Sequence, residues 1–171
     1  MARSSINDVV GSIVDPAQSW NFDLIFNKLP MGLGGDTSML TIRCQAANLP
    51  SVEMETVEVA LHGVEIRYRG RRTYSKTFEV TFIENVDYTT YQLFRDWHNL
   101  MLSWETNTGS SSGLYKVNCT LVCYDDAGKE VKSIDINGVW PTTVPQIDFD
   151  GSQSEAVKPQ ITFSFDTLSE S

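Results

Sequence analysis

The sequence predicts a mainly β fold of two packed antiparallel sheets, a sandwich or barrel, with one flanking α-helix and a short N-terminal helix. Short segments of alternating apolar and polar residues follow one another, turn signals join most of them as hairpins, and a single long segment has a helical period. The 171 residues suit one domain with a sizeable core. We therefore expect a single domain over residues 1–171, with residues 1–18 as an N-terminal docking segment.

A short amphipathic helix is predicted near the N-terminus, because apolar residues recur at helical spacing: Ile6, Val9, Val10, Ile13 and Val14. Asp15-Pro16 ends it, since a residue before proline disfavours helical geometry. Two or three turns are marginal alone, so this helix is expected to dock on its own domain or on a neighbour.

The next elements are predicted from alternation. A first strand covers residues 20–26, a glycine-rich loop covers 30–36, and a second strand carries Leu40, Ile42, Cys44 and Ala46. The glycines form no phosphate-binding loop, because no Gly-Lys-Ser/Thr follows them.

A two-stranded ribbon from Glu55 to Gly70 is the most clearly specified element, with its turn at His62-Gly63. The fold-back pairs apolar residues on one face: Leu61 with Val64, Val59 with Ile66, and Val57 with Tyr68. It pairs mostly charged residues on the other: Ala60 with Glu65, Glu58 with Arg67, and Thr56 with Arg69. Side chains alternate with period two, so the apolar face is expected to pack on the core.

After a basic corner near Gly70, a strand with one apolar face is predicted at residues 78–82. A long helix follows over residues 88–104, capped by Asp87, with a core-facing aromatic stripe: Tyr91, Phe94, Trp97, Met101 and Trp104.

The C-terminal part predicts a second hairpin, with strands at 115–123 and 131–136 around the turn 125–128. The chain then bends at 138–142 into 146–150, and a last strand points Ile161, Phe163 and Phe165 inward.

No catalytic, cofactor or metal site is predicted. Residues 109–113 match G-x-S-x-G, but a helix precedes them and a strand follows, the reverse of a nucleophile elbow. Three cysteines and two histidines give neither a disulfide framework nor metal-ligand spacing. No apolar run is long enough to span a membrane, and no signal segment opens the chain, so the protein is expected to work where it is made.

The net charge of −9 argues against a surface that grips nucleic acid, because such affinity needs basic groups that displace counterions. The basic residues are unevenly placed, and five of the 13 lie within ten positions: Arg67, Arg69, Arg71, Arg72 and Lys76. They form either a solvated strand end or a patch for an acidic partner.

Several short signatures occur in a fixed order: Ala47-Asn48-Leu49-Pro50, residues 70–74, Phe94-Arg95-Asp96-Trp97, Gly138-Val139-Trp140-Pro141-Thr142, residues 148–150 and residues 161–165. Together they resemble the tail tube proteins of contractile-tailed bacteriophages over nearly the whole chain. The loop at 31–36 and the Ser-Glu-Ser end depart from that pattern.

The resemblance implies a non-enzymatic structural subunit that assembles in the host cytoplasm into the virion tail. Its hexameric rings would stack into a hollow tube that conducts DNA into the host without binding it specifically. The implied partners are further copies, the tail sheath, and baseplate and tube-terminator proteins, with no membrane. A tube of a contractile injection or secretion system carrying protein, a tube-initiator or baseplate paralogue, and an enzyme or small-molecule binder remain alternatives.

Three surfaces are predicted for assembly. The ribbon is expected to complete a neighbour's sheet within a ring through Val57, Val59, Leu61, Gly63, Val64, Ile66 and Tyr68. The first candidate for the channel lining is the ribbon's charged face, with Glu58, Glu65, Arg67 and Arg69. The alternative is the hairpin at residues 115–136. A basic corner is expected to contact an acidic surface of the next ring: Arg71, Arg72 and Lys76.

Overall fold

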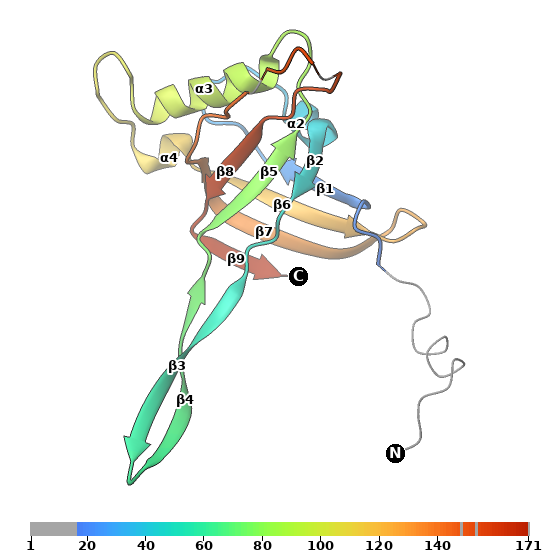
Figure 1. The fold of residues 1–171 in the computed structure, drawn as a ribbon. Coiled ribbons are helices and arrows are strands. Elements are labelled where there is room, and N and C mark those ends of the chain that lie inside the picture. Colours follow the sequence, from blue (N-terminus) through green and yellow to red (C-terminus); the bar gives the residue numbers. More distant parts are fainter. Residues whose placement is uncertain (1–16, 148, 153, 171) are drawn as a thin grey trace.

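The computed structural model describes residues 17–147, 149–152 and 154–170, and it shows a β-rich body from which a long two-stranded ribbon projects (Figure 1). The predicted helix at residues 6–14 lies outside the described residues. In chain order the elements are β1 (Phe22–Phe26), α2 (Thr37–Arg43), β2 (Cys44–Ala47), β3 (Val52–Leu61), β4 (Val64–Tyr74), β5 (Thr77–Phe82), α3 (Thr89–Met101), α4 (Ser112–Tyr115), β6 (Val117–Tyr124), β7 (Glu130–Pro141), β8 (Gln160–Ser164) and β9 (Thr167–Glu170).

The body consists of two antiparallel layers joined by one long strand. Strand β7 pairs with β6 and β9 along most of its length, and with β8 through Trp140 and Pro141. One layer is therefore β1-β6-β7-β9, and the other is the end of β7 with β8, β5 and β2. The predicted pair of packed antiparallel sheets is confirmed. The described strands do not close into a barrel, because β1 and β2 end the path without pairing.

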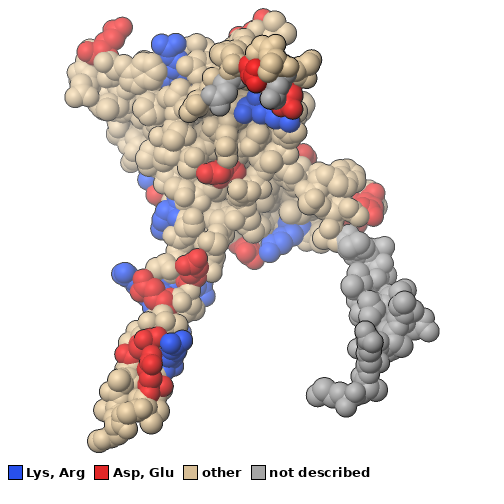
Figure 2. Space-filling view, in the orientation of Figure 1, with Lys and Arg blue, Asp and Glu red and all other residues tan. Residues whose placement is uncertain are grey.

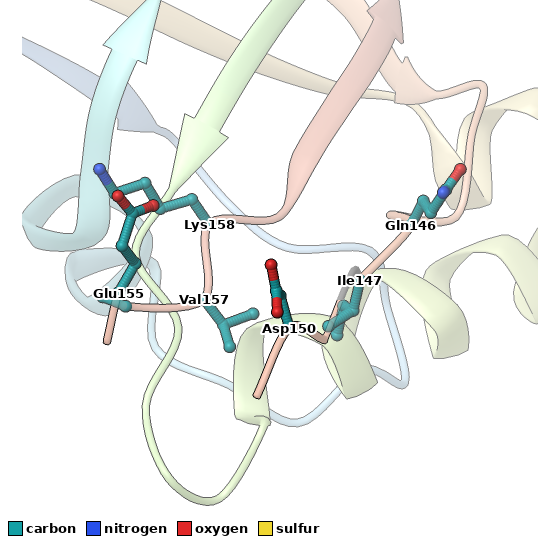
Figure 3. Close-up of a pocket in the computed structure, with 7 residues that line it drawn as sticks. Gln146, Ile147, Asp150, Glu155, Val157 and Lys158 are labelled. Atoms are coloured by element: carbon teal, nitrogen blue, oxygen red, sulfur yellow. The ribbon is translucent and has the colours of Figure 1, made fainter. Parts of the chain in front are cut away.

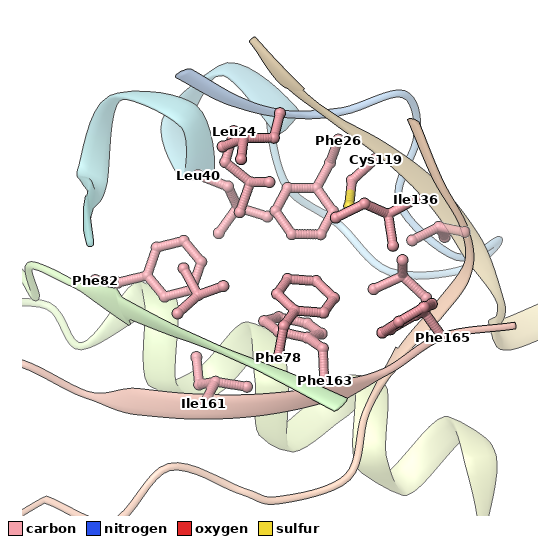
Figure 4. Packing of buried hydrophobic residues seen from close by; sticks show 14 of the residues in the cluster. Leu24, Phe26, Leu40, Phe78, Phe82, Cys119, Ile136, Ile161, Phe163 and Phe165 are labelled. Carbon is pink, nitrogen blue, oxygen red and sulfur yellow. The ribbon is translucent and has the colours of Figure 1, made fainter. Parts of the chain in front are cut away.

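An aromatic cluster centred on Phe163 fills the space between the layers (Figure 4). The Phe163 ring centroid lies 5.9 Å from that of Phe26, 5.3 Å from Phe78, 5.7 Å from Phe94 and 6.4 Å from Trp97. Burying each such side chain stabilises the fold by about 1.5–3 kcal/mol. The predicted inward positions of the last strand and of the strand at 78–82 are therefore confirmed.

Helix α3 closes one side of this cluster, but it begins and ends differently from the prediction. Asp87 is not its cap: the Glu84 carboxylate accepts hydrogen bonds from the Thr90 and Tyr91 N–H groups, and Asn85 accepts one from the Thr89 N–H. The chain enters the helix through Tyr88 in the left-handed conformation, at φ 53°. Because the helix ends at Met101, Trp104 is half exposed and not part of its core-facing stripe.

The segment predicted as a strand at 40–46 is mostly helical. Asp36 caps α2 by accepting a hydrogen bond from the Ser38 N–H, which commits residues 37–43 to a helix. Leu40 is then fully buried and Ile42 is 83% exposed, so the apolar alternation did not indicate a common face. Only β2 keeps the predicted extended form.

The C-terminal half follows the prediction more closely. The β6–β7 hairpin is confirmed, although Tyr115 belongs to α4 and β7 continues through the predicted bend to Pro141. Residues 146–150 form no strand where they are described. The short strand β9, which pairs with β7, was not predicted.

Candidate assembly surfaces

The ribbon of β3 and β4 has the predicted register. All six predicted pairs are present, and among the described strands β3 and β4 pair only with each other. The turn has φ 51° at His62 and φ 80° at Gly63. Two successive positive φ angles match the turn that follows the natural twist of a hairpin. The ribbon is longer than predicted, because pairing continues from Val52 to Tyr74.

The apolar face of the ribbon is uncovered in the single chain, so the expectation that it packs on the chain's own core is wrong. Five of its six residues are 41–60% exposed: Val57, Leu61, Val64, Ile66 and Tyr68. The reason is geometric, since the ribbon leaves the body and extends away from it (Figure 1). A contiguous exposed apolar surface of this kind marks a protein contact.

The charged face is internally paired. The Arg67 guanidinium lies 3.0 Å from the Glu58 carboxylate and 3.6 Å from that of Glu65. Exposed pairs of this kind contribute about 0.2–1 kcal/mol each. Arg69 lies opposite Thr56 and forms no ion pair with any residue that the structure describes. Figure 2 shows the resulting alternation of acidic and basic side chains along the ribbon, which stops short of its tip.

A bulge divides the ribbon at Gly70 and Arg71, which together lie opposite Glu55. A Cβ atom at position 70 would lie 2.8 Å from the Glu55 carbonyl oxygen. That distance is too short for a carbon atom, which explains the glycine. The Arg71 Nε lies 3.2 Å from the Glu55 carboxylate. Because the alternation along β3 is unbroken, the Met54–Arg72 pair lies on the opposite face from Arg71.

The predicted basic corner is therefore not one patch. Arg71 and Arg72 occupy opposite faces of the ribbon. Lys76 lies where the ribbon joins the body: its ammonium donates to the Asp166 carbonyl oxygen at 2.7 Å and lies 5.2 Å from the Tyr74 ring centroid. Lys76 thus ties the base of the ribbon to the body.

The signature residues mark structural positions. Gly138 has φ +70° at the point where β7 passes from one layer to the other. The Trp140 ring packs edge-on against Tyr115, at 6.2 Å between centroids. Pro141 is buried, and Thr142 donates to the Thr162 carbonyl oxygen through both its N–H and its hydroxyl group. Phe94 and Trp97 are fully buried in the aromatic cluster.

The outer face of the β1-β6-β7-β9 layer is largely polar, although Ile25 and Val122 also lie on it. One row across its four strands consists of Ile25, Thr120, Asp135 and Ser169. The Thr120 hydroxyl group donates to Asp135 at 2.7 Å. No lysine or arginine belongs to this row. Sequence reasoning ranked this hairpin second as a channel lining; the signal for it was the alternation of polar with buried residues along β6 and β7.

The described residues contain no cluster of three or more metal-ligating side chains. None of their helices has the length and apolar character needed to cross a bilayer. All three cysteines are free thiols, and burial raises the pKa of Cys44 and of Cys119 to about 12, with smaller contributions from Asp23 and Asp135. High pKa values keep both thiols protonated and unreactive.

A family model described as "Phage tail tube protein" matches residues 23–171. The chain belongs to the phage tail tube protein family. It is 27% identical over 129 residues to the tail tube protein gp19 of Enterobacteria phage T4, covering 74% of this chain and 78% of that protein. The gp19 of Enterobacteria phage T6 is 26% identical over the same coverage. As a phage tail tube protein, the chain is a structural component of the virion tail.

Two solved structures share the fold of this tail tube protein. One is the sheath/tube terminator of the extracellular contractile injection system PVC, with TM-score 0.67, 19% identity, and coverage of 93% of this chain and 99% of that one. The other is the PVC sheath-tube complex, with TM-score 0.62, 18% identity and coverage of 99% of each chain. At these identities the similarity establishes the fold and not the cargo.

Proposed function

We propose that this chain is the repeating subunit of a tail tube whose hexameric rings stack head to tail around a channel for DNA. The observation that carries the proposal is the uncovered apolar face of the ribbon. A monomer gains nothing from holding five large apolar side chains in water, whereas a neighbouring copy that covers them gains about 25 cal/mol per Å² of buried apolar surface. The role is structural and not enzymatic.

Within a ring, the ribbon face of each subunit contacts the adjacent subunit by a heterologous contact that closes cyclically. Val57, Val59 and Ile66, in the middle of the ribbon, form the main part of this contact. The outer surface of the assembled tube would meet the tail sheath, and its ends would meet baseplate and terminator proteins. Those assignments rest on family membership, not on a contact in the single chain.

The channel is assigned to the outer face of the β1-β6-β7-β9 layer. A tube wall needs a broad continuous surface, which this four-stranded layer offers and the isolated ribbon does not. DNA must pass without being held, because every phosphate neutralised by a basic group strengthens binding. A row with Asp135 and no cation meets that requirement. Protein cargo is not favoured by any specific feature of this face.

The decisive variant is Ile66→Glu, which places a charge in the apolar ribbon face. Its matched control is Thr56→Glu, an exposed position on the opposite face of the same ribbon that lies across from Arg69. Sedimentation should show rings and tubes for the control and monomers for Ile66→Glu, with unchanged circular dichroism for both. Equal assembly of the two variants would refute a role for the apolar face in ring formation.

A further inference from the structure

A hollow lies beside the beginning of α3. Helix α3 lies at the end of the body opposite the ribbon (Figure 1). The hollow has a volume of about 580 Å³, and its lining is aromatic and aliphatic apart from one glutamine: Tyr88, Tyr91, Pro145, Gln146, Ile147 and Phe149. Phe149 is 74% exposed at its rim, with its ring 6.3 Å from that of Tyr88. Aromatic and proline surfaces around a concave site are typical of a pocket that receives apolar side chains.

The tip of the ribbon has the complementary character. Leu61 and Val64 flank the turn, are more than half exposed, and form the last cross-strand pair. His62 and Gly63 make the turn itself, so the tip is narrow and carries no Asp, Glu, Lys or Arg side chain (Figure 2). A β3 strand of 10 residues reaches about 33 Å at roughly 3.3 Å per residue, so the tip lies well away from the body.

The charged residues near the hollow and on the ribbon are also of opposite sign. A second hollow adjoins the first, sharing Gln146 and Ile147, and Asp150 and Glu155 lie around it together with Lys158 (Figure 3). Hydrogen bonds from Ser152 lower the pKa of Asp150 and keep it ionised. On the ribbon, Arg67 is already paired with Glu58 and Glu65. Arg69 has no ion-pair partner in the described part of its own chain, so it is the ribbon cation that can face these carboxylates.

We propose that the ribbon tip of one copy inserts into the first hollow, the apolar pocket beside α3, of a second copy in the next ring. Leu61 and Val64 then contact Tyr91 and Phe149. The inference rests on the proposed tube. The tip and the pocket are complementary and lie at opposite ends of the folded subunit. Each copy can therefore insert its tip into one neighbour and accept the tip of another. Such a contact does not close on itself and propagates along an axis.

Cross-linking tests the contact directly. A double variant His62→Cys with Phe149→Cys, assembled and then oxidised, should give a covalent ladder on a non-reducing gel, because a disulfide needs α-carbons within about 7 Å. Each single variant should give no ladder above the wild-type background of its three native cysteines. The matched control pairs His62→Cys with Ala127→Cys in the exposed β6–β7 turn. Equal ladders from both pairs, or none from the first pair in intact tubes, would overturn the proposal.

A second measurement separates this contact from ring formation. Phe149→Ser should abolish long tubes while single rings persist, and Trp104→Ser, at another exposed aromatic residue, should leave tube length unchanged. Long tubes formed by Phe149→Ser would contradict the pocket assignment alone. Absence of both rings and tubes from the wild-type protein would instead contradict the proposed function, and with it this contact.

Discussion

The Asp166 carboxylate lies 2.8 Å from the Lys116 ammonium, and it occupies the space where a side chain at position 138 would stand. The same residue donates its N–H to the Asn137 carbonyl oxygen and accepts from Lys76 through its own carbonyl oxygen. Asp166 therefore joins the bend of β7 to the start of β6 and to the base of the ribbon. The contact explains why the sequence has glycine in the Gly-x-Trp-Pro-Thr signature.

Gly138→Ala should destabilise the fold by about 2 kcal/mol or more, because a left-handed backbone costs an L-residue about 1–2 kcal/mol and the new methyl group overlaps Asp166. Urea unfolding of the variant measures this. Gly34→Ala is the matched control, since that position has open space and should change stability by less than about 0.5 kcal/mol. A stability loss shared by both variants would rule out this explanation.

Glu84→Gln should destabilise the fold by about 1–3 kcal/mol. The Glu84 side chain is 1% exposed, and its carboxylate lies 3.8 Å from the Arg43 guanidinium. The same carboxylate accepts hydrogen bonds from two N–H groups at the start of α3. Thermal unfolding checks this against Glu105→Gln, an exposed residue that follows the helix. A melting temperature equal to that of the control would show that the charge at position 84 is dispensable.

Native Cys44 should react with iodoacetamide at pH 8 roughly a thousandfold more slowly than in urea, since its pKa of about 12 exceeds the ordinary thiol value of 9. The raised pKa has a stability consequence. Below pH 9 both folded and unfolded thiols are protonated, and above it the unfolded thiol ionises first, so folding stability should fall between pH 9 and pH 12. Mass spectrometry of the labelled peptide measures the rate; equal rates in buffer and urea would contradict the burial.

Asp135→Lys should permit tube assembly but retain DNA in the channel, with retention that weakens as salt rises. The control Glu79→Lys changes an exposed residue on the other layer and should release DNA normally. The pair Glu58→Lys with Glu65→Lys tests the ribbon as the lining. DNA ejection from assembled particles is the readout, and retention by the ribbon variant alone would move the channel back to the ribbon.

Sequence reasoning was most successful where the information is local. The ribbon register follows from a two-residue turn and six complementary pairs, all within 15 residues, and each pair supports the same alignment. The inward positions of β5 and β8 likewise follow from strict alternation. The exposure of the ribbon's apolar face was not predictable from its sequence, because alternation predicts an apolar face but not where that face lies relative to the body.

The errors at residues 37–43, at α3 and at the basic corner have other origins. At residues 37–43 the Asp36 cap outweighs an apolar alternation, so a cap signal needed more weight than a period of two. At α3 the capping groups come from Glu84 and Asn85, which reach the helix because Tyr88 adopts a left-handed turn. A backbone conformation of that kind has no clear signature in residue types. The split of the basic corner likewise depends on a bulge that only the register reveals.

Electron microscopy of the purified full chain tests the central claim most directly. Class averages in projection down the assembly axis should show closed six-membered rings with an open centre, and side views should show these rings stacked into tubes. Monomers that stay dispersed even at high protein concentration, or filaments without a central channel, would contradict the account.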